Sequence, residues 1–437
     1  MTTGRNIKNN SLPRLSADFY HHVLQLIIGT SAGQIIVFLF APILTRWFTP
    51  EQFSTLEQFT MLLNILVVLV TGKYEFAILH PKKEIEARRV MMLSIVLSII
   101  VSILLTIITI LFSGEIAHYY QNEQLQSCLW MLGPAILGSA LFNITFFWLN
   151  RNKKYIQLGL TKAIHGGLAE PIKWLAAIRE WGTHGLIIST TIGYLMGSIY
   201  CLFLLFKDQP ISRKDFEVEP LIIVAKQYKN YPLYSIWSSL LNRSAQWAHV
   251  GIFAHFYGLA AIGLMALCRR ILFTPLNLIG NSFSQVFFQQ ISEMEILTEI
   301  KNLYHRYLFR FLWIAAAMTG LVFLLPDDSM AWIFGEPWRD SIYYLRILSI
   351  WYSLNFVISA LSSITLRIQM QGISLLLDIL HFVFVYGAII LAFSMGMNDF
   401  QAMIFLVAAK VIYFALNLGI VSWQLHRTIT LNSTPQS

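Results

Sequence analysis

Nine lysines and arginines lie inside long apolar segments of the chain. They are Lys73, Lys162, Lys173, Arg243, Arg269, Arg270, Arg310, Arg346 and Lys410. A charge at the centre of a membrane helix costs about 2.5–3.5 kcal/mol on insertion scales, so such residues usually face a water-filled cavity. Arg310 and Arg346 lie near segment ends, where a long side chain can reach water. We expect the other seven to line a cavity, with snorkelling as the alternative for Lys73 and Lys162.

Only three acids, Glu75, Glu170 and Asp378, lie clearly within these segments, and Glu57 lies at the edge of one. The predicted interior therefore has more bases than acids, which favours an anionic ligand. Glu75, Glu170, Asp378 and His381 are candidates for coupling to an ion gradient of H+ or Na+. Asp378 and His381 are three residues apart, so they predict either a proton-coupling pair or hydrogen bonds to neighbouring helices.

Two segments present a polar helical face. Asn242 and Gln246 belong to one such face, and Asn277 and Asn281 follow Arg270 on another. Polar faces in lipid also join helices to one another. The cations on these faces favour a hydrophilic cavity instead. Lys73 and Glu75 are two residues apart, so we expect no direct pair between them on a helix.

The chain lacks the common metal-binding and nucleotide-binding motifs. HExxH, P-loop, CxxC and GxGxxG motifs are absent, and Cys128, Cys201 and Cys268 have no metal-type spacing. The longest loops predicted outside, 113–127 and 326–340, are too short for a catalytic domain. We therefore expect neither an enzyme nor a resident cofactor or metal.

Composition explains why cations are found in apolar surroundings. Of 437 residues, 56% are hydrophobic and 12% charged, whereas soluble domains have about 25% charged residues. Soluble, disordered, collagenous and disulfide-rich classes are excluded. The sequence predicts an all-α polytopic membrane protein of twelve helices in two six-helix halves. The segments are about 22–44, 56–79, 90–112, 128–149, 155–178, 184–206, 231–256, 260–291, 307–325, 341–365, 372–395 and 401–424.

Lysine and arginine set the predicted orientation, because they favour cytoplasmic loops. With both termini in the cytoplasm, inside segments hold 19 of the 31 basic residues and outside loops only Arg46, Arg179 and Arg339. This split explains the net charge of +8 without a nucleic-acid partner. No removable signal peptide is expected. The charged stretch 207–230 would then link an N-terminal bundle, 1–206, to a C-terminal bundle, 231–437.

Several runs resemble the Wzx-type polysaccharide flippases of the multidrug/oligosaccharidyl-lipid/polysaccharide exporter superfamily. They are GTSAGQ (29–34), APILTRWFTPEQF (41–53), KYEFAILHPK (73–82), YGLAAIGLMALCRRILFTPL (257–276) and SQVFFQQISE (284–293). One departure is Lys73, where such relatives often have arginine before Tyr-Glu. A point charge there replaces a planar, bidentate group.

The resemblance implies a flippase of the bacterial inner membrane for O-antigen or lipopolysaccharide synthesis. Such a protein moves an undecaprenyl-pyrophosphate-linked oligosaccharide to the outer leaflet by alternating access, among membrane lipids and other polysaccharide-assembly proteins. The resemblance also implies two six-helix bundles around a central cavity, in which the cavity cations would bind the pyrophosphate. The alternatives are an ion-coupled small-molecule exporter of the same superfamily and a membrane-embedded polysaccharide polymerase.

Overall fold

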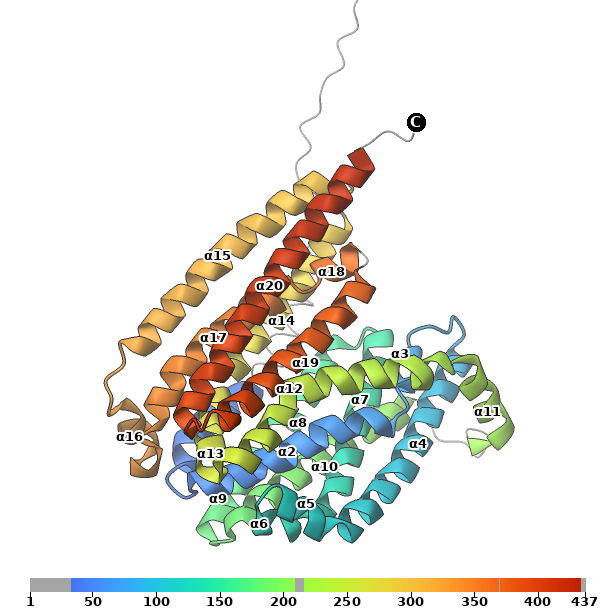
Figure 1. Cartoon of the computed structure of the whole chain (residues 1–437). Helices are drawn as coiled ribbons and strands as arrows, with labels where there is room; N and C mark the ends of the chain where they lie inside the picture. Colours follow the sequence, from blue (N-terminus) through green and yellow to red (C-terminus); the bar gives the residue numbers. More distant parts are fainter. Residues whose placement is uncertain (1–32, 209–215, 369, 434–437) are drawn as a thin grey trace, which may run out of the picture.

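The computed structural model describes residues 33–208, 216–368 and 370–433, and every regular element in them is a helix (Figure 1). The predicted all-α membrane fold is confirmed. Five basic residues used for the predicted orientation lie outside the described residues, as does the start of the first segment. They are Arg5, Lys8, Arg14, Arg213 and Lys214.

Nine helices in the described part of the chain are long and apolar enough to cross a membrane. They are α2 (Pro50–Val70), α4 (Glu84–Leu111), η1 (Leu129–Met131) with α7 (Leu132–Arg151), α10 (Gly182–Asp208), α13 (Leu259–Cys268) continuing through η4 (Arg269–Phe273) into α14 (Thr274–Ser292), α15 (Leu297–Phe323), α17 (Ser341–Leu361), α19 (Gln371–Ser394) and α20 (Asp399–Ser433).

The three other predicted segments also contain helix. They are Gly33–Leu44, the pair α8 (Tyr155–Gly167) and α9 (Ala169–Ile178), and η3 (Tyr231–Ser235) continuing into α12 (Ile236–Tyr257). Short helices lie in the connections. They are α3 (Tyr74–Ala77), α5 (Ser113–Tyr119), α6 (Glu123–Gln126), α11 (Val218–Gln227), α16 (Ser329–Phe334), η5 (Glu336–Trp338) and α18 (Ile364–Arg367).

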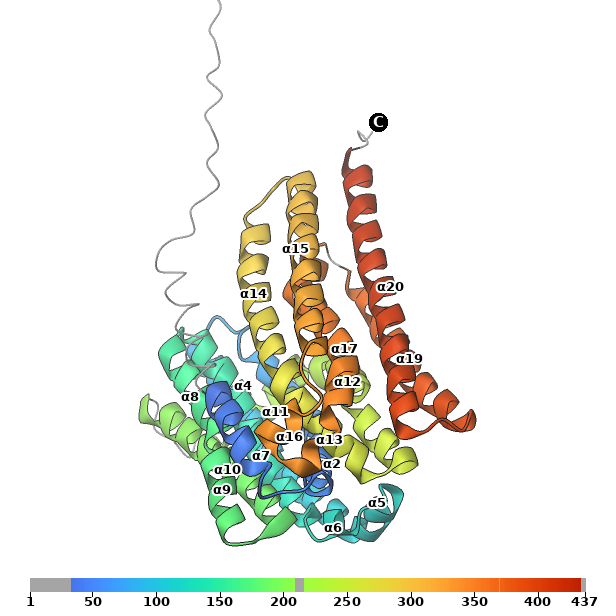
Figure 2. The same ribbon diagram turned by 90° about the vertical axis from the view of Figure 1, so that its left-hand side faces the viewer.

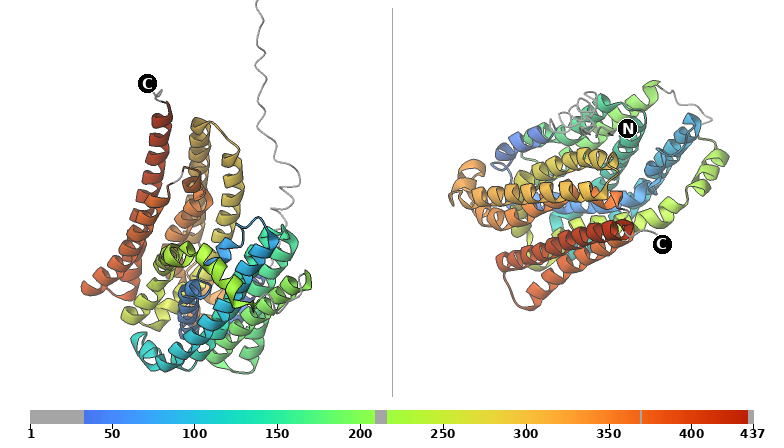
Figure 3. Two further views of the ribbon diagram at one scale, coloured as in Figure 1. Left: turned by 90° about the vertical axis from the view of Figure 1, so that its right-hand side faces the viewer. Right: turned by 90° about the horizontal axis from the view of Figure 1, so that it is seen from above.

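The helices form two groups that meet at α2. In the first group α7 packs against α4 and α10, and in the second α17 packs against α14, α15 and α20. Helix α2 contacts α7 of the first group and also α12 and α13. Helices α5, α6 and α16 lie at one end of the molecule, and α18 lies toward the other, where α20 ends (Figures 1 and 2). Viewed from above, α19 and α20 form one edge of the assembly (Figure 3).

We call the contact between the two groups the seam, formed by α2 and its preceding loop against α12, α13 and η5. Helix α2 begins with a capping box between Thr49 and Gln52. Just before it, the carbonyl of Thr45 accepts a 2.8 Å hydrogen bond from Nε1 of the buried Trp338. The Phe53 ring meets Trp338 edge-on, with centroids 5.2 Å apart. These contacts hold the two groups together near the end that carries α5, α6 and α16.

Proline explains two irregular places in the helices. Pro171 lacks an N–H and its ring crowds the carbonyl of Gly167, where α8 ends and α9 follows. Pro275 acts in the same way on Ile271, within the π-helical turn η4. Such π turns are rare and occur frequently at functional sites. Here the turn contains both Arg269 and Arg270.

Replacement of Gly263 tests how closely the seam is packed. A Cβ built at Gly263 of α13 would lie 1.9 Å from the carbonyl oxygen of Pro50, a backbone atom that cannot rotate away. We expect Gly263→Ala to destabilise the protein by about 1–3 kcal/mol, as overpacking does. Gly387→Ala in α19 is the matched control, because its Cβ meets nothing within 4 Å. Thermal unfolding in detergent measures both, and equal unfolding temperatures would contradict this packing.

Candidate functional site

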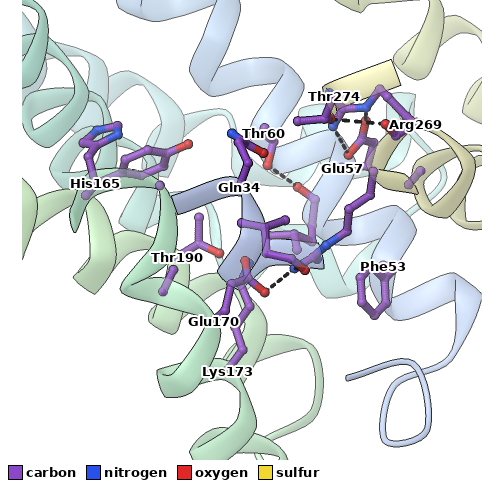
Figure 4. A pocket seen from close by; sticks show the side chains of 17 residues that line it. Gln34, Phe53, Glu57, Thr60, His165, Glu170, Lys173, Thr190, Arg269 and Thr274 are labelled. Atoms are coloured by element: carbon purple, nitrogen blue, oxygen red, sulfur yellow. Dashed lines mark hydrogen bonds and ion pairs between the residues drawn. The ribbon is translucent and has the colours of Figure 1, made fainter. Parts of the chain in front are cut away.

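Two cavities gather most of the predicted site residues. The larger, of about 720 Å³, is lined by residues of α12, α14, α17, α19 and α20 together with Lys73, and we call it the asparagine-lined cavity. The smaller, of about 270 Å³, lies between α2, α9 and η4, and we call it the ion-pair cavity (Figure 4).

Amide side chains from four helices converge on the asparagine-lined cavity. They are Asn242 and Gln246 of α12, Asn277 and Asn281 of α14, Asn355 of α17 and Asn417 of α20. The first four are the residues predicted from helical spacing. Amides donate and accept hydrogen bonds together, as the hydroxyl groups of sugars do. The cavity can therefore hydrogen-bond to a polyhydroxylated ligand.

The same cavity contains cations without a neutralising carboxylate. Arg243 is exposed to the cavity, and Lys410 lines it while only 1% of its surface is accessible. Neither forms an ion pair with any described residue within 4.0 Å. An unpaired charge at this depth is tolerated next to a polar space. Arg243 and Lys410 are therefore suited to bind an anion.

Aromatic and imidazole rings hold Lys410 in place. Its Nζ lies 3.5 Å from the centroid of the Trp351 ring on α17 and 3.4 Å from Nε2 of His381 on α19. The His381 ring stacks on Tyr413, with centroids 4.5 Å apart. Cation–π contacts stabilise an ammonium group without neutralising it.

Asp378 and His381 line one cavity but have different partners. Asp378 accepts a 3.0 Å hydrogen bond from Asn242, whose own oxygen accepts one of 2.7 Å from Gln246. Among the hydrogen bonds between described residues, none joins Asp378 to His381. Of the two predicted alternatives, bonding to a neighbouring helix describes this structure better than a direct pair.

Two carboxylates in the ion-pair cavity pair with three of the predicted cavity cations (Figure 4). Arg269 contacts both oxygens of Glu57, with Nε 2.7 Å from Oε1 and Nη2 2.8 Å from Oε2. Arg270 pairs with Glu170, which also accepts a 2.9 Å hydrogen bond from Lys173. Arg269, Arg270 and Lys173 were expected to line a cavity, and all three line this one, each beside a carboxylate.

Two expectations need correction. Lys73 pairs with Glu75 at 3.7 Å, although their spacing predicted no contact. The prediction assumed a helix, but Lys73 has a left-handed backbone (φ 61°) in the break between α2 and α3. Lys162 lines neither of the two cavities. Its Nζ lies 5.0 Å from the centroid of the Phe146 ring, which provides a cation–π contact instead.

Sequence reasoning left out four residues that line the asparagine-lined cavity. They are Trp351, Asn355, Tyr413 and Asn417. A signal for them was present, because Asn355 follows Trp351 by four residues and Asn417 follows Lys410 by seven, with Tyr413 between. Glu57, named only as an acid at the edge of a segment, lines the ion-pair cavity. Within the described ranges, no cluster of three or more His, Cys, Asp or Glu side chains could hold a metal ion.

Removing the Glu170 carboxylate tests the charge balance of the ion-pair cavity. Glu170→Ala leaves Arg270 and Lys173 without their carboxylate, and breaking a buried pair in this way costs about 3–5 kcal/mol. Lys410→Met should cost far less, because it removes a buried charge that has no carboxylate partner among the described residues. Thermal unfolding of the purified variants compares them. A Glu170→Ala variant as stable as Lys410→Met would contradict the pairing.

Comparison with known proteins identifies the fold and the family. The model of a family described as polysaccharide biosynthesis protein matches residues 43–342. No curated protein matches the sequence. The structure is similar to an inward-facing multidrug resistance MATE-family transporter of the MOP superfamily, with a TM-score of 0.72 and 15% identity over 94% of this chain and 96% of that one.

Two further solved structures share the fold. Lipid II flippase MurJ in an inward closed conformation has a TM-score of 0.66 and 14% identity, covering 96% of this chain and 94% of that one. An outward-facing MATE-family transporter has a TM-score of 0.59 and 15% identity, covering 94% and 96%. The chain therefore has the two-lobed fold of MOP-superfamily transporters, and it belongs to the polysaccharide biosynthesis protein family.

Proposed function

We propose that this protein is a flippase for a lipid-linked oligosaccharide. It moves an oligosaccharide joined to undecaprenyl pyrophosphate from the cytoplasmic to the outer leaflet of the bacterial inner membrane, without covalent change. Family membership supports a role in polysaccharide biosynthesis. The similarity in fold to a protein described as a lipid II flippase supports a lipid-linked substrate. O-antigen or another lipopolysaccharide component is the product class that we favour.

The lining of the asparagine-lined cavity is the observation that carries this proposal. Arg243 and Lys410 offer positive charge that no described carboxylate neutralises, and charge-assisted hydrogen bonds to phosphate are stronger than neutral ones. The surrounding amides suit sugar hydroxyl groups, and Trp351 and Tyr413 supply aromatic faces. A ligand that joins an anion to a saccharide matches both halves of this chemistry.

We further propose that two six-helix bundles, 1–206 and 231–437, alternate around these cavities, with 207–230 as a cytoplasmic linker. The distribution of lysine and arginine supports cytoplasmic termini, which puts α5, α6 and α16 outside. The seam would then close the outer side. The higher TM-score to the inward-facing than to the outward-facing transporter fits that state.

Coupling to an ion gradient is part of the proposal. Asp378 and His381 line the asparagine-lined cavity and are the groups we favour for H+ or Na+. Glu75 and Glu170 are less suited, because each already pairs with a cation. Other proteins of polysaccharide assembly would receive the substrate after transport.

An exporter of small organic cations is the second candidate, and the fold similarity to a multidrug transporter favours it. The charge of the cavity argues against it, because Arg243 and Lys410 repel organic cations. A polymerase is less consistent with loops as short as 113–127 and 326–340.

Substitution of the two uncompensated cations tests the proposal. Arg243→Gln and Lys410→Met should each weaken binding of the lipid pyrophosphate about ten- to hundredfold, because a hydrogen bond to a charged group contributes about 1.5–3 kcal/mol. Lys162→Gln is the control, a membrane cation outside both cavities. Transport of the glycan lipid by purified protein in liposomes is the measurement. Full transport by both cavity variants would contradict the assignment.

Deletion of the gene identifies the substrate. The expected result is accumulation of a lipid-linked saccharide that faces the cytoplasm and loss of the matching surface polysaccharide. Efflux of dye cations from proteoliposomes, with no movement of glycan lipid, would favour the exporter instead.

A further inference from the structure

The ion pairs of the ion-pair cavity join helices from opposite sides of the seam. Glu57 belongs to α2 and Glu170 to α9, whereas both arginines belong to η4. Arg269 is 212 residues from Glu57 in the sequence, and Arg270 is 100 residues from Glu170. Figure 4 shows Glu57 and Arg269 approaching each other from different helices, with Glu170 and Lys173 on a third. These contacts therefore connect the two helix groups directly.

Burial makes these pairs strong constraints on the relative position of the groups. Glu57 is 7% and Glu170 3% exposed, so most of each side chain is shielded from water. The five side chains of the network contain three cations and two carboxylates. Separating the groups would break the pairs of Arg269 with Glu57 and of Arg270 with Glu170, and only the pair of Glu170 with Lys173 within α9 would remain. Removing one partner of a buried pair is far more costly than removing an exposed one.

The network lies toward the closed end of the molecule. Glu57 is about two turns from the start of α2, and Arg269 follows the first ten residues of the helix that begins at Leu259. Both helices start at the end that carries α5, α6 and α16, where Pro50 and Gly263 are in contact. Any movement that opens this end must pull Glu57 away from Arg269.

Arg270 has capacity for a further hydrogen bond. Its Nε is buried and has no hydrogen-bond partner among the described residues, while Nη2 contacts Glu170 and the carbonyl oxygen of Val37. The 270 Å³ cavity beside it includes Thr60, Thr190 and Gln34. An oxyanion that enters this cavity lies beside Arg270, and guanidinium groups form bidentate pairs with phosphate as they do with carboxylate.

We infer that Glu57 and Glu170 form a latch with Arg269, Arg270 and Lys173 that keeps the α5/α6/α16 end closed, and that a phosphate anion releases it by replacing the carboxylates on the arginines. The inference rests on the alternating access of the proposed function. It assigns Glu57 and Glu170 a positioning role, distinct from ion coupling. The arginines then bind carboxylate in one state and phosphate in the other.

Distance measurement between spin labels tests the latch without any substrate. Glu123→Cys in α6 and Met395→Cys at the end of α19 place labels on exposed positions at the closed end, one in each helix group. Labelling of the chain without these substitutions gives the blank, since Cys128, Cys201 and Cys268 are buried. Double electron–electron resonance of the protein in nanodiscs then reports the closed and open populations.

Glu57→Gln should raise the ratio of open to closed molecules about tenfold or more, because a charge-assisted hydrogen bond is weakened. Glu75→Gln is the matched control, since it breaks a pair with Lys73 on one side of the seam and should leave the distances unchanged. The exchange Glu57→Arg with Arg269→Glu should restore the closed population. An unchanged distribution in Glu57→Gln, an equal change in the control, or opening that the exchange does not reverse would overturn the latch.

Undecaprenyl pyrophosphate added to the wild-type labelled protein tests the release step. It should lengthen the distance, and undecaprenol, which lacks the anion, should not. An unchanged distance between the labels after addition of the pyrophosphate would overturn release by phosphate. The latch itself is tested separately by the Glu57→Gln and charge-exchange variants. The proposed function has its own test. It would be contradicted if no lipid-linked saccharide accumulated after deletion of the gene.

Discussion

A charge buried in apolar surroundings must meet an opposite charge or a polar space, and this constraint organises the interior of the molecule. Five of the membrane cations fall into two classes under this constraint. Arg269, Arg270 and Lys173 meet carboxylates, whereas Arg243 and Lys410 meet a cavity. The first class connects the helix groups, and the second leaves positive charge available. The chain thus uses the same residue types for cohesion and for recognition.

Much of the fold could be predicted from the sequence. Apolar stretches of suitable length located the helical segments, because lipid requires backbone hydrogen bonds to be satisfied within each segment. Helical spacing also placed Asn242, Gln246, Asn277 and Asn281 together correctly, since residues three, four or seven apart share a face. Both successes depend on short-range geometry that the sequence records directly.

Pairing across the seam could not be predicted in the same way. Glu57 and Arg269 are 212 residues apart, and nothing in the local sequence of either indicates the other. The left-handed backbone of Lys73 and the π turn that contains Arg269 and Arg270 were likewise not predicted from the local sequence. Counting charges revealed an excess of bases, but only the tertiary arrangement shows which of them are compensated.

The helix that runs from Leu259 through η4 to Ser292 touches both cavities. Its π turn presents Arg269 and Arg270 to the smaller one, and its continuation presents Asn277 and Asn281 to the larger. Since this helix is continuous, a rotation about its axis would move Arg269, Arg270, Asn277 and Asn281 together. In the proposed flippase, such a rotation would change the lining of the asparagine-lined cavity and the ion pairs of the arginines together.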